Sequence, residues 1–221
     1  MEKIIFTSNY NNVIHGNKIS ISKDKGKDAG YEGKKLLSLA PKEEFFRIWK
    51  NNIGKIPEDE NNLYYIKNFY EQILKNKDPE IFIETLPNNS ILLCYEENNC
   101  FCHRHLVAFW LELFLDIKTY EVKEVDNYKL KKQERPEYLK EVLENIIKES
   151  YNMHGFQSIR AAYLFEGAER LEKSIEEMYK GKILDEYEGE LYTIAARLRM
   201  DADEAEEKYL EEKNKIMKYT K

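Results

Sequence analysis

The stretch ILLCYEENNCFCHRHLVAFWLE, residues 91–112, decides the fold and places the candidate site. Its first residues belong to a continuous apolar run, Ser90–Tyr95, which is typical of a strand buried on both faces of a sheet. A polar turn follows, and the next apolar pattern predicts a helix from about His103 to Leu115. Ligands of open parallel α/β sheets bind beyond the C-terminal ends of the strands. We therefore expect a site at this turn.

The segments around this stretch alternate between strand-like and helix-like patterns. Short apolar or alternating runs predict further strands at Lys3–Ser8, Lys18–Ser22 and Thr119–Val125. Helical patterns lie between them, starting near Pro41, over Asn62–Asn76 and over Asp78–Leu86, the last with Asp78 as N-cap and Pro79 at the first position. This order predicts an α/β fold, with a small, mostly parallel sheet flanked by helices.

The pattern from Arg135 onward is helical only. Amphipathic helices are expected at Pro136–Glu149, Gly155–Tyr179, Tyr187–Arg199 and Asp201–Tyr219. We therefore divide the chain into an α/β domain, residues 1–134, and an all-α C-terminal extension or small bundle, residues 135–221.

Composition limits the classes of partner. The 221 residues include 35 Lys+Arg and 41 Asp+Glu, for a net charge of -6, and 42% are hydrophobic, enough for a core. The first 134 residues hold 20 basic and 21 acidic side chains, and the rest hold 15 and 20, so the acidic excess is C-terminal. This balance makes duplex nucleic acid a poor partner. A basic loop from Lys23 to Lys35 is the exception, since it follows a strand and could meet a phosphate.

The chain start and the cysteines bear on the cellular location of the protein. The start, MEKIIFTSNYNN, lacks a signal-peptide pattern, and the longest apolar stretch, Leu106–Ile117, is shorter than the roughly 20 residues of a membrane span. Three cysteines, an odd number, do not suit a disulfide framework. We expect a cytoplasmic protein with no membrane partner, and the oligomeric state stays undetermined at this stage.

The predicted helix start carries the candidate chemistry. Cys102, His103 and Arg104 lie where a helix offers unpaired N–H groups and a partial positive charge. The dipole and the Arg104 guanidinium are expected to lower the pKa of the Cys102 thiol, which makes it a candidate nucleophile. His103 is a candidate donor or acid/base, Arg104 a candidate anion holder, and Glu96 is expected to orient Arg104 or a histidine.

Helical spacing suggests different environments for the two histidines. His103 lies in line with Leu106 and Trp110, the expected core-facing stripe, whereas His105 is expected to be more exposed and is a candidate ligand contact. Cys94 ends the buried strand and should face the same crevice, although a small hydrophobic role is the competing interpretation.

A zinc site is an open alternative. Cys94, Cys102, His103 and His105 are zinc ligands in type, but their spacing fits no common finger. Adjacent residues such as Cys102 and His103 rarely both reach one ion. From the sequence alone we therefore assign no metal ligand and no cofactor.

These residues carry a family resemblance. The run LLCYEENNCFCHRHLVAFWLE, together with KIIFTSNYNN, KISISKDKG, YEGKKLLSLAP and DPEIFIETL, resembles number 488 among the domains of unknown function, a bacterial and archaeal family, over about residues 1 to 125. The resemblance implies a compact α/β domain, but it implies no particular reaction. The site positions that it implies are Cys94, Glu96, Cys102, His103 and Arg104. The polar positions that it expects to face the same crevice are Ser8, Asn9, Ser20 and Ser22. The chain departs from the family pattern in its ENN loop, which lacks the usual Gly or Pro, and in Cys100, which is an extra cysteine.

Three functions remain open from the sequence. The first is binding of a small anionic or nucleotide-like ligand around Cys102, His103 and Arg104, with a thiol-dependent reaction as an extension of it. The second is a zinc site made of Cys94, Cys102 and a histidine. The third is a non-enzymatic interaction module that works through the acidic helical part.

Overall fold

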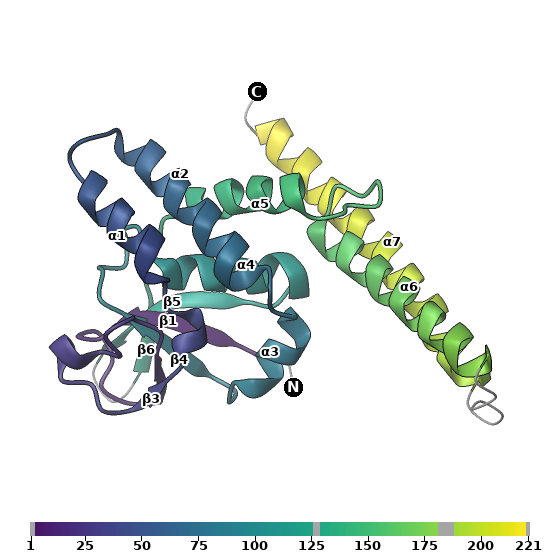
Figure 1. The fold of residues 1–221 in the computed structure, drawn as a ribbon, viewed down its shortest axis with the longest axis horizontal. Coiled ribbons are helices and arrows are strands. Elements are labelled where there is room, and N and C mark those ends of the chain that lie inside the picture. Colours follow the sequence, from purple (N-terminus) through teal and green to yellow (C-terminus); the bar gives the residue numbers. More distant parts are fainter. Residues whose placement is uncertain (1–2, 126–128, 181–187, 220–221) are drawn as a thin grey trace. The chain divides into compact units, whose positions relative to one another are not determined.

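The computed structural model describes residues 3–125, 129–180 and 188–219 (Figure 1). Residues 1–147 and 148–221 form two compact units. The elements, in chain order, are β1 (Ile5–Asn9), β2 (Asn17–Ser20), η1 (Lys27–Ala29), β3 (Lys34–Lys35), η2 (Leu37–Leu39), α1 (Glu43–Asn52), α2 (Glu58–Phe69), η3 (Tyr70–Leu74), α3 (Pro79–Thr85), β4 (Ser90–Cys94), α4 (His103–Leu115), β5 (Thr119–Val125), β6 (Lys129–Lys132), α5 (Tyr138–Ser150), α6 (Ile159–Lys180) and α7 (Glu188–Tyr219).

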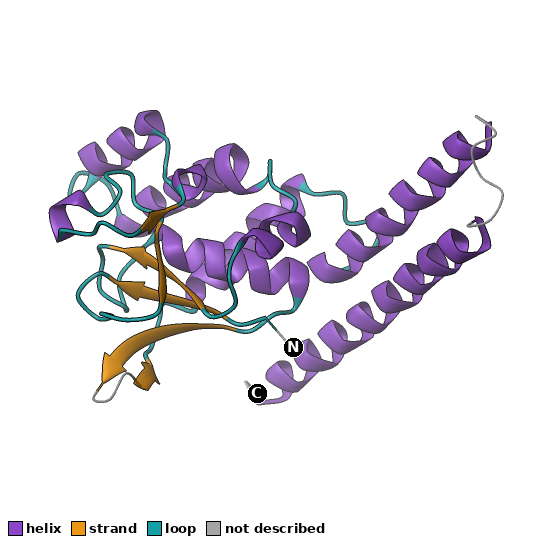
Figure 2. Ribbon diagram, turned by 90° about the horizontal axis from the view of Figure 1, so that it is seen from below, coloured by secondary structure: helices purple, strands orange, loops and turns teal. Residues whose placement is uncertain are grey.

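The first unit is an α/β fold built on one sheet. Its strands lie in the order β3-β2-β4-β1-β5-β6, and all neighbours are parallel except the antiparallel pair β5 and β6. Figure 2 shows the strands as one twisted layer with helices packed against it. The mostly parallel sheet with flanking helices confirms the predicted fold class.

Strand β4 occupies the interior of the sheet. It pairs with β1 on one side and β2 on the other, and all five of its residues are buried. A strand that is covered on both faces needs apolar side chains at every position. This is why the run SILLC has no polar alternation, as the sequence pattern predicted.

Helix α4 follows β4 and packs on β1, β4 and β5. Ten of its residues are buried, among them Phe109 and Trp110, so it is covered on more than one face. It ends at Asp116, whose backbone has φ 53° and whose N–H donates to the Glu112 carbonyl. The helix therefore acts as the core element that fixes Cys102 and His103 beside the end of β4.

The two edge strands were not expected. β3 has two residues and β6 has four, and every one of them is exposed. The sequence offers no burial pattern there, because edge strands with lysine side chains are held by backbone pairing to a neighbour.

The helical part holds fewer helices than predicted among the described residues. The expected helix over Asp201–Tyr219 continues directly from the preceding one, so both lie in α7, and Tyr187 lies outside the described residues. No proline or glycine interrupts the chain near Asp201, and Ala195 and Ala202, on either side of it, are both buried. Arg199 pairs with Glu172 of α6 at 2.6 Å.

The expected boundary after residue 134 stays a prediction. Within the first unit, Arg135 and Lys140 each lie 2.9 Å from the Glu112 carboxylate of α4. In the described part of the chain, no helix is both long enough and apolar enough to cross a membrane.

The start of α3 provides a first stability prediction. The Asp78 carboxylate accepts hydrogen bonds from the backbone N–H groups of Glu80 and Ile81 at 2.9 and 3.0 Å, which confirms the predicted N-cap. We expect Asp78→Ala to lower the free energy of unfolding by about 1 kcal/mol, measured by urea denaturation. Asp78→Asn retains an acceptor oxygen and should lower the free energy of unfolding much less. An equal loss of stability in both variants would contradict the capping role.

Candidate functional site

A cavity of about 530 Å³ opens at the end of β4. It lies where the parallel strands end, as predicted from the strand–turn–helix pattern. Its lining residues are Ser22, Lys23, Asp24, Asp28, Pro41, Phe46, Trp49, Lys50, Tyr65, Cys94, Tyr95, Glu96, Phe101, Cys102 and His103.

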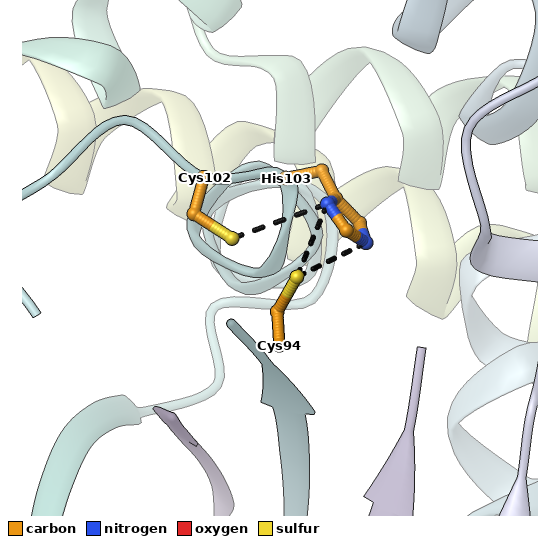
Figure 3. Close-up of side chains that lie close together, drawn as sticks. All are labelled: Cys94, Cys102 and His103. Carbon is orange, nitrogen blue, oxygen red and sulfur yellow. Dashed lines mark hydrogen bonds between the residues drawn. The ribbon is translucent and has the colours of Figure 1, made fainter. Parts of the chain in front are cut away.

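Two thiols and an imidazole lie close together in this lining. Cys94 is the last residue of β4, Cys102 is the N-cap of α4, and His103 is its first residue. Figure 3 shows the three side chains pointing toward one another. The Cys94 and Cys102 sulfurs lie 3.7 and 3.9 Å from His103 Nδ1. Each residue is at most 6% exposed, so the group is almost entirely removed from bulk water.

A backbone carbonyl sets the orientation of the His103 ring. Nε2 lies 3.0 Å from the Ile21 carbonyl oxygen, which can only accept a hydrogen bond. Nε2 therefore carries a proton and donates it to Ile21. In the neutral ring this leaves the lone pair on Nδ1, the nitrogen that faces both sulfurs.

Glu96 completes the cluster. Its Oε2 accepts hydrogen bonds from the Cys102 thiol at 2.9 Å and from the Cys94 thiol at 3.2 Å. Burial raises the pKa of this carboxyl group, but the two thiol hydrogen bonds and further interactions outweigh burial, and the net pKa is lowered. Glu96 thus contacts the thiols. Of the two partners expected for it, Arg104 pairs with Glu121 instead, and the histidine, His103, belongs to the same cluster as the thiols.

The expected low pKa of the Cys102 thiol is wrong. Burial raises its pKa well above the usual value, and the hydrogen bond and charge of Cys94 add to this rise. The attraction of the Arg104 guanidinium acts in the opposite direction and is smaller. The helix N-terminus therefore does not produce a resting thiolate here, because the sulfur has lost its contact with water.

Arg104 does not line the cavity. Its side chain is fully buried and forms a salt bridge of 3.1 Å with Glu121 of β5. Nη2 also donates to the Glu97 carbonyl at 3.0 Å. The expected role as an anion holder is therefore not supported, because the guanidinium is directed into the protein and already has a carboxylate partner.

The burial of His105 is the opposite of what helical spacing predicted. His105 is completely buried, whereas His103 keeps 6% of its surface exposed. Its Nδ1 lies 3.6 Å from the Glu121 carboxylate. Burial, followed by the charges of Arg104 and Arg135, lowers the pKa of His105 well below its usual range. The expectation fails because α4 is covered on both of the faces that we compared.

The four polar residues expected to face the crevice lie in different environments: two belong to β1, one belongs to β2, and Ser22 follows β2. Ser22 lines the cavity. Ser8 donates to the Val122 carbonyl at 2.6 Å, Asn9 donates to Glu97 at 3.1 Å, and Ser20 lies 2.6 Å from the Tyr10 hydroxyl. Only Ser22 is thus placed as a candidate ligand contact, and the other three hold buried backbone and loop groups together.

The aromatic side of the cavity was not predicted from the sequence. Trp49 of α1, Tyr65 of α2 and Phe101 of the turn before α4 form a connected group, with ring centroids 5.1–5.7 Å apart. Phe46 of α1 and Tyr95 lie in the same lining. Aromatic residues at helical spacing look like ordinary core positions, so only the neighbouring Phe101 offered a local signal.

The comparisons with known proteins identify no relative. No family model matches the chain, and no curated protein and no solved structure matches it either.

Proposed function

We propose that this protein binds a small anionic molecule that carries a flat ring, of the size and chemistry of a nucleotide. The observation that supports this most is the cavity of about 530 Å³ at the end of β4. That volume lies in the range of small-molecule sites, which are mostly apolar with a few placed polar groups. The resemblance to family 488 is compatible with such a site but suggests no ligand.

The aromatic side of the cavity suits a ring. Trp49 and Phe101 have centroids 5.7 Å apart, and Tyr65 meets Phe101 edge-on at 5.1 Å. A nucleobase can stack on such faces whatever its hydrogen-bonding pattern, which contributes about 1–3 kcal/mol per base. The Trp49 indole is already held in place, since its N–H donates to Asn62 at 3.1 Å.

Two lysines supply positive charge. The ammonium groups of Lys50 and Lys23 lie 4.8 and 5.8 Å from the centroid of the Phe46 ring. Lys23 is also paired with Glu43, which leaves Lys50 as the better contact for a phosphate. The Asp24 carboxylate lines the cavity too, but it accepts hydrogen bonds from Ser22, Tyr95 and two backbone N–H groups, and its pKa is lowered to about 2. Those donors stabilise the ionised carboxylate but do not remove its charge, so we place the anionic group of the ligand at Lys50 and away from Asp24.

Tryptophan fluorescence tests the proposal. The chain has two tryptophans, so a Trp110→Phe background reports Trp49 alone. We expect a purine nucleoside monophosphate, titrated with a chelator present, to quench this signal saturably. Lys50→Ala should weaken the apparent affinity about tenfold, the effect of one lost charge-assisted hydrogen bond.

The matched control is Lys67→Ala, an exposed lysine of α2 that does not line the cavity. Its affinity should equal that of the background protein. If the nucleoside without phosphate binds as tightly as the nucleotide, the anionic part of the proposal is wrong. Absence of quenching by every nucleotide up to millimolar concentration would reject the proposal as a whole.

A further inference from the structure

We propose that Cys94, Cys102 and His103 form a binding site for Zn²⁺, with its fourth coordination position directed to Glu96 and the cavity. This goes beyond ligand binding, because it assigns an inorganic ion to the cluster. Among the described residues, these three bring one ligand atom each within 4.8 Å of the others.

The spacing of the ligand atoms agrees with a tetrahedral ion. Zn–S bonds of about 2.3 Å and Zn–N bonds of about 2.0–2.1 Å place sulfur and nitrogen about 3.5 Å apart. The observed distances from His103 Nδ1 to the two sulfurs are 3.7 and 3.9 Å. Only small movements of the side chains would be needed to accept the ion.

The local backbone explains how adjacent residues reach one ion. Cys102 is the N-cap of α4 and has an extended backbone, with φ -155° and ψ 144°, whereas His103 begins the helix. The change of backbone conformation between them turns both side chains toward Cys94 (Figure 3). Adjacent residues rarely both reach one ion, but at this helix start the Cys102 and His103 side chains point toward the same place.

The hydrogen bond from His103 to Ile21 is the kind of support that metal-binding histidines use. A ligating imidazole usually donates its other N–H to a carbonyl or carboxylate, which fixes the tautomer and the ring orientation. Here Nε2 donates to the Ile21 carbonyl at 3.0 Å, and Nδ1 remains available to the ion. The orientation required for coordination is therefore already present.

Charge and chemistry favour zinc. Two thiolates and one neutral imidazole neutralise a divalent cation, and this sulfur-rich donor set suits Zn²⁺ better than Mg²⁺ or Ca²⁺. On binding, each thiol loses its proton to solvent, so one ion replaces two protons. The Oε2 atom of Glu96 lies 2.9 and 3.2 Å from the sulfurs and would lose both thiol hydrogen bonds on zinc binding, which makes it the candidate for the fourth position.

The competing explanation is a purely structural cluster. In that case the two thiols are small buried groups that donate hydrogen bonds to Glu96, as they do without any ion. Such a cluster accounts for the carboxylate contacts. A structural cluster can also include the contacts of His103 Nδ1 with the two sulfurs, but it does not require the three donor atoms to have the spacing that a metal ion needs.

The test is titration of the chelator-treated full chain with Co²⁺ and Zn²⁺, with no organic ligand present. Cobalt should give a thiolate charge-transfer band in the near ultraviolet and the visible bands of a tetrahedral site, saturating at one ion per chain. Zinc should displace it and release two protons per ion in weakly buffered solution. Both readouts use the unmodified protein, so they do not depend on whether a variant folds.

Matched variants then assign the ligands. Cys94→Ser and Cys102→Ser should each lower zinc affinity by more than about 100-fold, and Glu96→Gln by about 10–100-fold with the cobalt–thiolate band retained. Cys100→Ser removes the exposed cysteine and should leave affinity unchanged. A wild type without the thiolate band, or a band lost only in Cys100→Ser, would overturn the site. Because the nucleotide titration contains a chelator, either proposal can fail while the other stands.

Discussion

Glu121→Ala is expected to lower the free energy of unfolding by about 3–5 kcal/mol, the cost of leaving a buried charge without its partner. Both Glu121 and Arg104 are fully buried and 3.1 Å apart. Removing the carboxylate leaves a guanidinium that burial alone cannot neutralise, since arginine stays protonated. Equilibrium urea denaturation measures the loss.

The contacts of Glu121 explain why the effect should be large. Its two oxygens accept hydrogen bonds from the Arg104 Nη2 and Nε atoms at 3.1 and 3.2 Å, and from the Thr7 hydroxyl at 2.6 Å. These groups belong to β5, α4 and β1, so one carboxylate joins the helix of the candidate site to two strands.

Two controls separate the buried charge from the loss of a side chain. Arg104→Met combined with Glu121→Leu removes both charges and should recover most of the stability, because no unpaired ion remains. Glu71→Ala removes one half of an exposed pair with Lys75, 2.9 Å apart, and should cost only about 0.3–0.5 kcal/mol. If Glu121→Ala lost no more than Glu71→Ala, the buried ion pair would not be stabilising α4 as we describe.

Phe109→Ala is expected to lower the free energy of unfolding by about 3–5 kcal/mol as well, through a cavity in the core. Phe109 lies in the middle of α4 and is completely buried. Its ring also lies 4.3 Å from the Arg135 guanidinium carbon, so the substitution removes a cation–π contact together with apolar packing. Thermal and urea denaturation should both report the loss.

Ile81→Ala is the matched control for this variant. Ile81 is an apolar residue of α3 that is 70% exposed, so its truncation should change stability by no more than about 0.5 kcal/mol. A loss below about 1 kcal/mol for Phe109→Ala would show that α4 can collapse into the vacated space. The helix would then be a weaker anchor for Cys102 and His103 than its burial indicates.

Local patterns in the sequence predicted most of the parallel sheet and the strand end at which the cavity opens. Strand β4 is buried at all five positions because neighbours cover both of its faces, and its sequence is therefore recognisably apolar from Ile91 onward. The cap at Asp78 is likewise decided within three residues of chain. The edge strands β3 and β6 have no such apolar pattern, since their residues are exposed and only backbone pairing holds them.

The candidate site, too, has one part that local sequence predicts and another that depends on the tertiary structure. The sequence by itself determined that Cys94, Glu96, Cys102 and His103 would meet at the end of a buried strand, because a strand, a short turn and a helix keep nearby residues together. Only the tertiary structure decided what surrounds them. It turned Arg104 toward Glu121, buried His105, raised the pKa of Cys102, and brought Trp49 and Tyr65 to the cavity. The physical reason is that burial and charge pairing depend on segments distant in the chain, which no local spacing specifies.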